Sequence, residues 1–267
     1  MRLKDRLDPM IKAKKLMNRL DNSIYHFIHE KYHAILLLRR WSDAESVGLN
    51  GQLHRKRIFR DLVNACAFEA IVETGTFKGD SAAYMAQTAN LPVYTSEVNA
   101  RFSLLARVRL RSVPEVNFFV GDSRKFLRLL PIILKDRSKR LFFYLDAHWY
   151  DDLPLEGELD IIARDWEQFV IMIDDFQVPG DEGYGYDSYS DDQTLTFGRF
   201  ANVFRRHCLI PFFPTLPSGE ETGIKRGCVV LAREANVVEI LGQISSIRRK
   251  DVCLINGPEG GISASDR

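Results

Sequence analysis

The stretch AIVETGTFKGDS, residues 70–81, decides the fold of this chain. Its apolar start is typical of a buried strand that ends at Glu73, and a helix is expected to begin near Ser81. Between them, Gly75 and Gly79 let the backbone approach a ligand closely, and the free amides at the start of the helix face that ligand. The spacing E-x-G-x-x-x-G lacks the glycine triplet of a dinucleotide site. The turn therefore favours a ligand with a cationic amino-acid head over a diphosphate.

The same strand, turn and helix unit recurs along the chain. The expected strands are Ala70–Glu73, Pro92–Glu97, Val116–Val120, Leu141–Asp146 and Phe169–Asp174. The helices expected after them are Ser81–Gln87, Ala100–Arg111, Ser123–Leu134 and Leu155–Trp166. Strands that are apolar almost throughout and are joined by helices predict an α/β fold with a mainly parallel, doubly wound sheet.

The segment after this core is expected to complete the sheet. A helix is predicted at Thr196–Arg206, and Phe212–Pro217 with Cys228–Ala232 is predicted to form an antiparallel pair. The acidic, glycine- and tyrosine-rich stretch 179–187 is typical of a loop that lies over a site and selects the substrate.

The segment before the core reads as helical. Apolar residues at three- and four-residue steps predict helices from Pro9 to Trp41, and Gly48–Gly51 interrupts the pattern. A further helix is expected at Arg55–Phe68. We therefore expect a helical N-terminal extension over residues 1–50 and the α/β domain over residues 51–267.

Composition excludes several classes of protein. Hydrophobic residues make up 45% of the chain and charged residues 27%, an ordinary globular balance, and a net charge of +1 gives no overall field for nucleic acid. The four cysteines form no C-x-x-C pair, so neither a zinc cluster nor a secreted disulfide framework is expected. Apolar runs such as Phe169–Ile173 are too short to span a bilayer. These features predict a cytoplasmic protein.

Charge is unevenly distributed. Residues 1–40 hold ten Lys/Arg and four Asp/Glu, which is typical of a solvated amphipathic helix face. Contact with a membrane surface and a homodimer interface are alternative roles for this basic segment. Residues 141–192 hold fifteen Asp/Glu and one Arg. Carboxylates at this density repel one another unless a cation or solvent relieves them.

Acidic residues close the next two strands as well, where ligands of parallel sheets bind. Glu97 lies about 20 positions beyond the glycine turn, and a carboxylate there can accept both hydroxyls of a ribose. Asp122 follows the third strand and can accept a hydrogen bond from an adenine amino group. Ser123 is either a second contact or the N-cap of the next helix.

The fourth and fifth strands end at Asp146 and at the pair Asp174 and Asp175. Neighbouring parallel strands would bring the three carboxylates to one edge, where a hard cation such as magnesium, calcium or manganese would neutralise them. Solvated carboxylates that end the strands are the other interpretation. His148 is a candidate general base, although a histidine in this place can also be a hydrogen-bonding loop residue.

These motifs carry a resemblance. Residues Phe68–Val178 resemble class I S-adenosylmethionine-dependent methyltransferases, and more narrowly the metal-dependent O-methyltransferases of the catechol and macrocin types. The resemblance implies a Rossmann-like fold and methyl transfer to a hydroxyl group. It covers somewhat under half of the chain, and the D…DD pair of motifs is its more specific part.

The resemblance also implies a role for each strand end. The first turn would hold the methionine part of the donor, Glu97 the ribose, and Asp122 would lie by the adenine. The expected donor contacts are Glu73, Gly75, Thr76, Gly79, Ser81, Glu97, Asp122, Ser123 and Asp146. The expected ligands of Mg²⁺ or another divalent cation are Asp146, Asp174 and Asp175.

Some assignments stay open. Catechol-type enzymes place a lysine three residues after the metal-binding Asp as general base, but Trp149 stands there, so His148 is expected to act instead, as a nearby His does in macrocin-type enzymes. The expected activity is metal-assisted O-methylation of a small-molecule or sugar hydroxyl. A metal-independent methyltransferase and a non-catalytic S-adenosylmethionine-binding protein are the alternatives. The sequence does not identify the acceptor.

Overall fold

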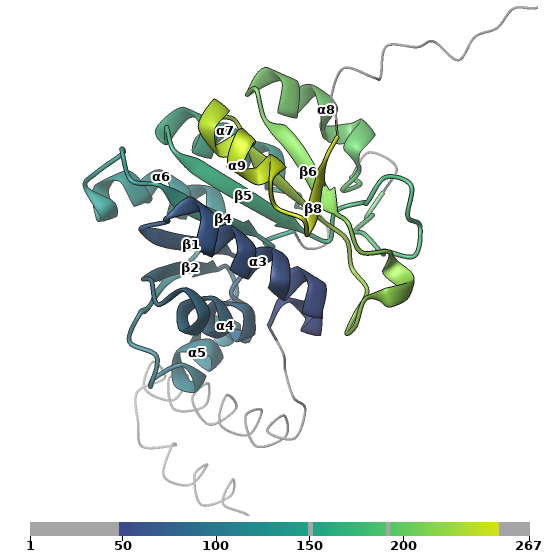
Figure 1. The fold of residues 1–267 in the computed structure, drawn as a ribbon. Helices are drawn as coiled ribbons and strands as arrows, with labels where there is room; N and C mark the ends of the chain where they lie inside the picture. The colour runs from purple at the N-terminus through teal and green to yellow at the C-terminus, as the bar shows by residue number, and fades with distance from the viewer. Residues whose placement is uncertain (1–47, 149–151, 191–192, 251–267) are drawn as a thin grey trace, which may run out of the picture.

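Figure 1 shows a computed structural model of the 267-residue chain, which describes residues 48–148, 152–190 and 193–250. Most of the expected N-terminal extension and Trp149 lie outside the described residues. The expected division at residue 50 therefore stays a prediction. Within the described ranges, no helix combines the length and the apolar character needed to cross a membrane.

The described residues form one sheet. Its strands are β1 (Ala70–Thr74), β2 (Val93–Glu97), β3 (Val116–Val120), β4 (Leu141–Leu145), β5 (Phe169–Asp174), β6 (Ile210–Pro214), β7 (Cys228–Ala232) and β8 (Ile247–Arg249). Their order across the sheet is β3-β2-β1-β4-β5-β7-β6-β8. Strands β1 to β5 are parallel, whereas β7 is antiparallel to β5 and β6, and β8 is antiparallel to β6.

Helices cover both faces of the sheet (Figure 1). They are α3 (Leu53–Cys66), α4 (Asp80–Ala89), α5 (Ala100–Arg109), α6 (Ser123–Leu134), α7 (Leu155–Asp165), α8 (Phe197–Arg206) and α9 (Ala235–Gly242). Helices α3, α4, α5 and α9 lie on one face, and α6, α7 and α8 lie on the other. Adjacent strand residues point to opposite faces, so Phe142 packs in the first layer and Phe143 in the second. Both are fully buried, as a doubly wound sheet requires.

Local signals explain where the helices begin and end, as α6 illustrates. The side chain of Asp122 accepts a hydrogen bond from the Lys125 amide at 3.1 Å and caps the first turn. Phe126 and Leu130, four residues apart, belong to its buried face. The helix ends at Leu134, and the residue after it, Lys135, adopts a left-handed conformation with φ of 58°.

The expected alternation of strands and helices is confirmed, and so is the C-terminal antiparallel pair. Element ends differ by at most three residues. The largest difference is at the end of β6, which is Pro214 rather than Pro217, and its start is two residues earlier than expected because Ile210 pairs with Ala232 of β7. Helix α9 and strand β8 had no counterpart in the sequence analysis. Both are short, and α9 buries only Val237 and Leu241.

The turn at Gly48–Gly51 is more than a break between segments. The side chain of Leu49 is buried, and its amide donates a hydrogen bond to the Ser81 hydroxyl at 3.1 Å. Leu49 and Asn50 both adopt φ of 58°, which is unfavourable for residues with side chains. The Ile224 amide donates to the Asn50 carbonyl at 2.9 Å. The turn is therefore packed against the carboxyl edge of the sheet.

Candidate active site

The glycine turn after β1 packs directly on the end of β4. Gly75 has φ of +88°, and a Cβ built there would lie 2.2 Å from the Asp146 carbonyl oxygen. Gly79 has φ of +81° and precedes α4, where a Cβ would lie 2.8 Å from the Leu110 side chain. Only glycine satisfies both the left-handed backbone and the backbone contact at position 75, whereas at position 79 the left-handed backbone favours glycine and the Leu110 side chain would have to move for a Cβ.

Glu73 lies in a buried polar chain behind this turn. Its Oε2 accepts a hydrogen bond from the Thr95 hydroxyl at 2.6 Å, and that hydroxyl lies 2.5 Å from the hydroxyl of Thr76. The other carboxyl oxygen, Oε1, has no hydrogen-bond partner in the described structure. Burial raises the pKa of Glu73 to about 8. A cationic group bound nearby would favour the ionised form.

A cavity of about 480 Å³ opens at the carboxyl ends of β1 to β4, a size suited to a small-molecule ligand. Five of the nine expected donor contacts line it, namely Gly75, Glu97, Asp122, Ser123 and Asp146. The other four lie outside its lining: Glu73 and Thr76 in the buried chain, Gly79 at the helix start, and Ser81 against the Leu49 amide.

Glu97 is held rigidly at the cavity wall. Its two oxygens accept backbone hydrogen bonds from Phe77 and from Asn99, each at 2.8 Å. Each oxygen keeps a lone pair for a further donor. The rings of Phe77 and Phe102 meet edge to face beside it, with centroids 4.6 Å apart, and both line the cavity. This pair of an oriented carboxylate and apolar rings suits a ribose and its base.

The carboxylate at the end of β3 is more heavily engaged than expected. Asp122 rather than Ser123 is the N-cap of α6, and Ser123 is the first helical residue. Asp122 also pairs with Arg124, whose Nε lies 3.2 Å from each carboxyl oxygen and which binds Asp152 as well. The hydrogen bond from Arg124 lowers the pKa of Asp122. Its carboxylate therefore faces the cavity in ionised, ion-paired form.

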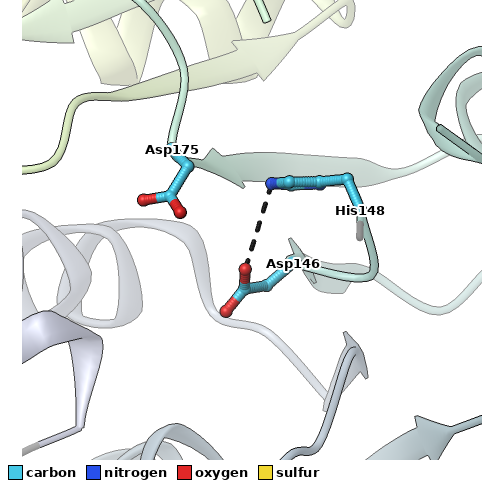
Figure 2. Close-up of side chains that lie close together, drawn as sticks. All are labelled: Asp146, His148 and Asp175. Atoms are coloured by element: carbon cyan, nitrogen blue, oxygen red, sulfur yellow. Dashed lines mark ion pairs between the residues drawn. The ribbon is translucent and has the colours of Figure 1, made fainter. Parts of the chain in front are cut away.

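Asp146 and two further side chains lie close together in an arrangement that can hold a metal ion. Asp146, His148 and Asp175 each offer one ligand atom, and these atoms all lie within 4.8 Å of one another (Figure 2). His148 Nε2 lies 3.9 Å from Asp146 Oδ1. Burial lowers the pKa of His148, and the nearby acids and the Asp174 backbone oppose this effect only in part. The imidazole is therefore neutral near pH 7, the form that binds metals or accepts a proton.

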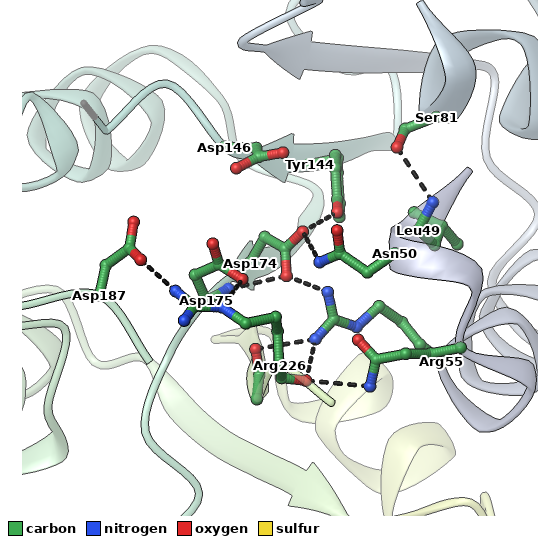
Figure 3. A network of polar contacts seen from close by, with 12 residues as sticks. Leu49, Asn50, Arg55, Ser81, Tyr144, Asp146, Asp174, Asp175, Asp187 and Arg226 are labelled. Atoms are coloured by element: carbon green, nitrogen blue, oxygen red, sulfur yellow. Dashed lines mark hydrogen bonds and ion pairs between the residues drawn. The ribbon is translucent and has the colours of Figure 1, made fainter. Parts of the chain in front are cut away.

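Asp175 is fixed by a second arginine. Its backbone is left-handed, with φ of 52°, and its Oδ1 accepts a hydrogen bond from Arg226 Nε at 2.8 Å. Arg226 also pairs with Asp187 (Figure 3). Asp187 in turn accepts a hydrogen bond from the Tyr189 hydroxyl. That hydroxyl lies 2.6 Å from the His148 carbonyl oxygen. The loop containing Asp187 thus closes over the acidic site.

The Asp174 carboxylate lies in the same region, but other groups already donate hydrogen bonds to it. It forms a buried ion pair with Arg55 of α3, with both side chains at most 2% exposed. Its other donors are the Asp175 amide at 2.7 Å, the Asn50 side-chain amide at 3.1 Å and the Tyr144 hydroxyl. Four donors use the hydrogen-bonding capacity of a carboxylate (Figure 3).

Sequence reasoning missed the residues that contact the acidic site but lie far from it in sequence. Arg55 stands in the run HRKR, residues 54–57, and nothing in the sequence distinguishes it from Arg57, which faces solvent. Arg226 lies 51 positions after Asp175, and no acidic residue of this site is close to it in sequence. Asp187 belongs to the acidic stretch expected to cover the site, so that expectation located it without giving its partner.

No protein-family model and no curated protein sequence matches this chain. Solved structures are similar to it. One is an O-methyltransferase from Bacillus cereus in complex with SAH, with a TM-score of 0.50 and 15% identity over 84% of this chain and 96% of that one. Another is a candidate caffeoyl-CoA O-methyltransferase from Staphylococcus aureus, with a TM-score of 0.52 and 16% identity over 80% of this chain and all of that one.

Likeness at this level of identity concerns the fold. The strand order, the helices on both faces and the antiparallel end of the sheet agree with the fold expected from the resemblance. This chain has the Rossmann-like fold of the class I S-adenosylmethionine-dependent methyltransferases.

Proposed function

We propose that this chain is an S-adenosylmethionine-dependent O-methyltransferase that acts on a small-molecule or sugar hydroxyl with the help of a divalent cation. One observation carries the proposal. Asp146 lines the cavity bounded by Gly75, Glu97 and Asp122, and it also belongs to the candidate metal-binding group with His148. A donor in that cavity would therefore lie directly beside a site able to hold an acceptor hydroxyl.

The residues of the cavity would bind and orient the donor. Glu97 offers its free lone pairs to the ribose hydroxyls, and Phe77 with Phe102 packs against the base. The buried Glu73 and the partly exposed Asp146 would carry negative charge once the donor binds, because its cationic part favours the ionised form of a nearby carboxyl. Holding the methyl group in line with the acceptor oxygen is the main source of rate enhancement in such a transfer.

In the transfer, the acceptor oxygen attacks the methyl carbon. The new C–O bond forms as the C–S bond breaks, and the sulfonium becomes the neutral thioether of S-adenosylhomocysteine. The acceptor proton must leave, and the neutral His148 ring has nitrogens free to take it. A divalent cation, when bound, lowers the pKa of the acceptor hydroxyl. His148 Nε2 can hold a proton or a cation, but not both.

Calorimetry with S-adenosylmethionine and S-adenosylhomocysteine tests the donor site. Glu97→Ala should weaken binding about ten-fold or more, because a charge-assisted hydrogen-bond pair is lost. The matched control is Glu167→Ala, an exposed carboxylate just before β5 at the opposite edge of the sheet. A parent protein that binds neither compound would refute the proposal, and unchanged binding by Glu97→Ala would refute the ribose contact.

Methyl transfer without a metal ion is the second candidate, and the Arg55–Asp174 pair favours it, because Arg55 already neutralises one of the acids. Turnover of a phenol or sugar panel with and without chelator separates the two. A third candidate, donor binding without catalysis, predicts a calorimetric signal with no methylated product. The expected cytoplasmic location, homodimer and absence of a nucleic-acid partner stay predictions.

A further inference from the structure

We propose that the cation site of this chain is built from Asp146, His148 and Asp175 rather than from three aspartates, and that it selects a transition-metal ion over Mg²⁺. The inference deepens the proposed function, since it concerns the same site. It rests on the surroundings of His148 and on the hydrogen bonds that Asp174 already accepts.

The surroundings of His148 call for a ligand. The side chain is 1% exposed, and among the described residues neither ring nitrogen has a hydrogen-bond partner of normal geometry, although the Asp174 backbone lies near the ring. Buried polar groups without a partner are rare in folded proteins, because each has lost its hydrogen bonds to water. The 3.9 Å between Nε2 and Asp146 Oδ1 is too long for a hydrogen bond. A cation between these two atoms would satisfy both.

The geometry fits such an ion. Ligand distances of about 2.0–2.2 Å separate neighbouring ligand atoms by about 3 Å and opposite ones by about 4 Å. The ligand atoms of Asp146, His148 and Asp175 already lie within 4.8 Å of one another. Figure 2 shows the His148 ring directed toward the two carboxylates.

Asp174 cannot join this set without breaking a buried ion pair. Its oxygens already accept from Arg55, Asn50, Tyr144 and the Asp175 amide. A metal bond would leave the guanidinium of Arg55, at 1% exposure, without its counter-ion. By contrast, Asp146 is one-third exposed and faces the cavity.

The ligand types decide which ion is preferred. An imidazole nitrogen with two carboxylates suits Zn²⁺, Co²⁺ and related ions, whereas Mg²⁺ prefers oxygen ligands alone and retains its water. The site should therefore bind Co²⁺ and Zn²⁺ more tightly than Mg²⁺, by at least about a hundred-fold in dissociation constant.

The test is a Co²⁺ titration of the untagged, metal-free full chain, followed by the visible absorption of the ion and by thermal melting. We expect one equivalent to bind, Zn²⁺ to displace it and millimolar Mg²⁺ to leave it in place. His148→Ala should weaken Co²⁺ binding at least ten-fold. The control is His207→Ala, which should leave Co²⁺ binding unchanged, because His207 is the C-cap of α8 and pairs with Asp160. Circular dichroism of each variant checks that it is folded.

Asp174→Asn tests the other half of the inference, that Asp174 is not a ligand of the cation. It should keep Co²⁺ binding within about three-fold of the parent, and the double variant Arg55→Met with Asp174→Asn should do the same if the single variant does not fold. Unchanged Co²⁺ binding by a folded His148→Ala, or displacement of Co²⁺ by equimolar Mg²⁺, would overturn the inference. Because no methyl donor is present, these results are independent of the proposed function, which the calorimetry of donor binding tests separately.

Discussion

The Arg55–Asp174 ion pair provides a direct test of how this site is held. Arg55→Met keeps most of the side-chain volume of α3 but removes the guanidinium. Asp174 then keeps only its neutral donors, and the carbonyl oxygens of Arg226 and Gly227 lose the hydrogen bonds that Arg55 gives them. The variant therefore leaves a buried charge without a counter-ion.

The size of the effect follows from burial. Both partners are at most 2% exposed, so solvent screening is weak. Removing one partner of a buried pair lowers the free energy of unfolding by about 3–5 kcal/mol. For a chain of this size that corresponds to a decrease of roughly 6–20 °C in melting temperature. Asp174→Asn in the same background removes the uncompensated charge and should restore part of the loss, which appears as a coupling energy of about 2 kcal/mol.

Urea denaturation of the parent, both single variants and the double variant measures this cycle. Arg57→Met is the matched control, because Arg57 lies on the same helix at 56% exposure and makes only exposed contacts among the described residues, an ion pair with Asp61 and a hydrogen bond to Ser245. Its effect should be about 0.5 kcal/mol or less. The reasoning fails if Arg55→Met unfolds within about 1 kcal/mol of the parent, or if the coupling energy is close to zero. Arg55→Met should also gain Mg²⁺ affinity, because Asp174 becomes available as an oxygen ligand.

Three further predictions concern the donor side of the site. The pKa of Glu73 is raised from 4.5 to about 8, so between these pH values the folded state holds a proton that the unfolded state has lost. The free energy of unfolding should therefore fall as the pH rises from about 4.5 to 8. In urea denaturation without donor, Glu73→Gln should remove a few kcal/mol of that fall. Gly75→Ala should destabilise the chain by more than about 3 kcal/mol and abolish donor binding, because its Cβ would lie 2.2 Å from the Asp146 carbonyl oxygen. The control Gly198→Ala in α8, whose Cβ meets nothing within 4 Å, should be neutral or stabilising by up to about 1 kcal/mol. Equal melting temperatures of the two variants would contradict the packing argument at Gly75. Phe102→Ala should weaken S-adenosylmethionine binding about two- to ten-fold in calorimetry, the contribution of one edge-to-face partner, while full affinity would show that the ring does not contact the base.

Several features could be predicted from the sequence because they depend on neighbours along the chain. The turn from Glu73 to Ser81 carries its own glycine requirement, and apolar strands alternating with amphipathic helices predict a parallel sheet with helices on both faces. In such a sheet the carboxyl ends of β1 to β4 meet at one edge, so the positions of Glu97, Asp122 and Asp146 around a common cavity followed as well.

Other features depend on contacts between residues far apart in sequence, and only the tertiary structure decides them. Arg55 meets Asp174 across 119 positions, and the ligand atoms of His148, Asp146 and Asp175 lie within 4.8 Å of one another. Sequence reasoning brought the acids together correctly but could not tell which of them remains available. A carboxylate can accept only about four hydrogen bonds. Which donors use that capacity depends on how α3 and the loop at Arg226 pack against the sheet edge, and no local pattern records that packing.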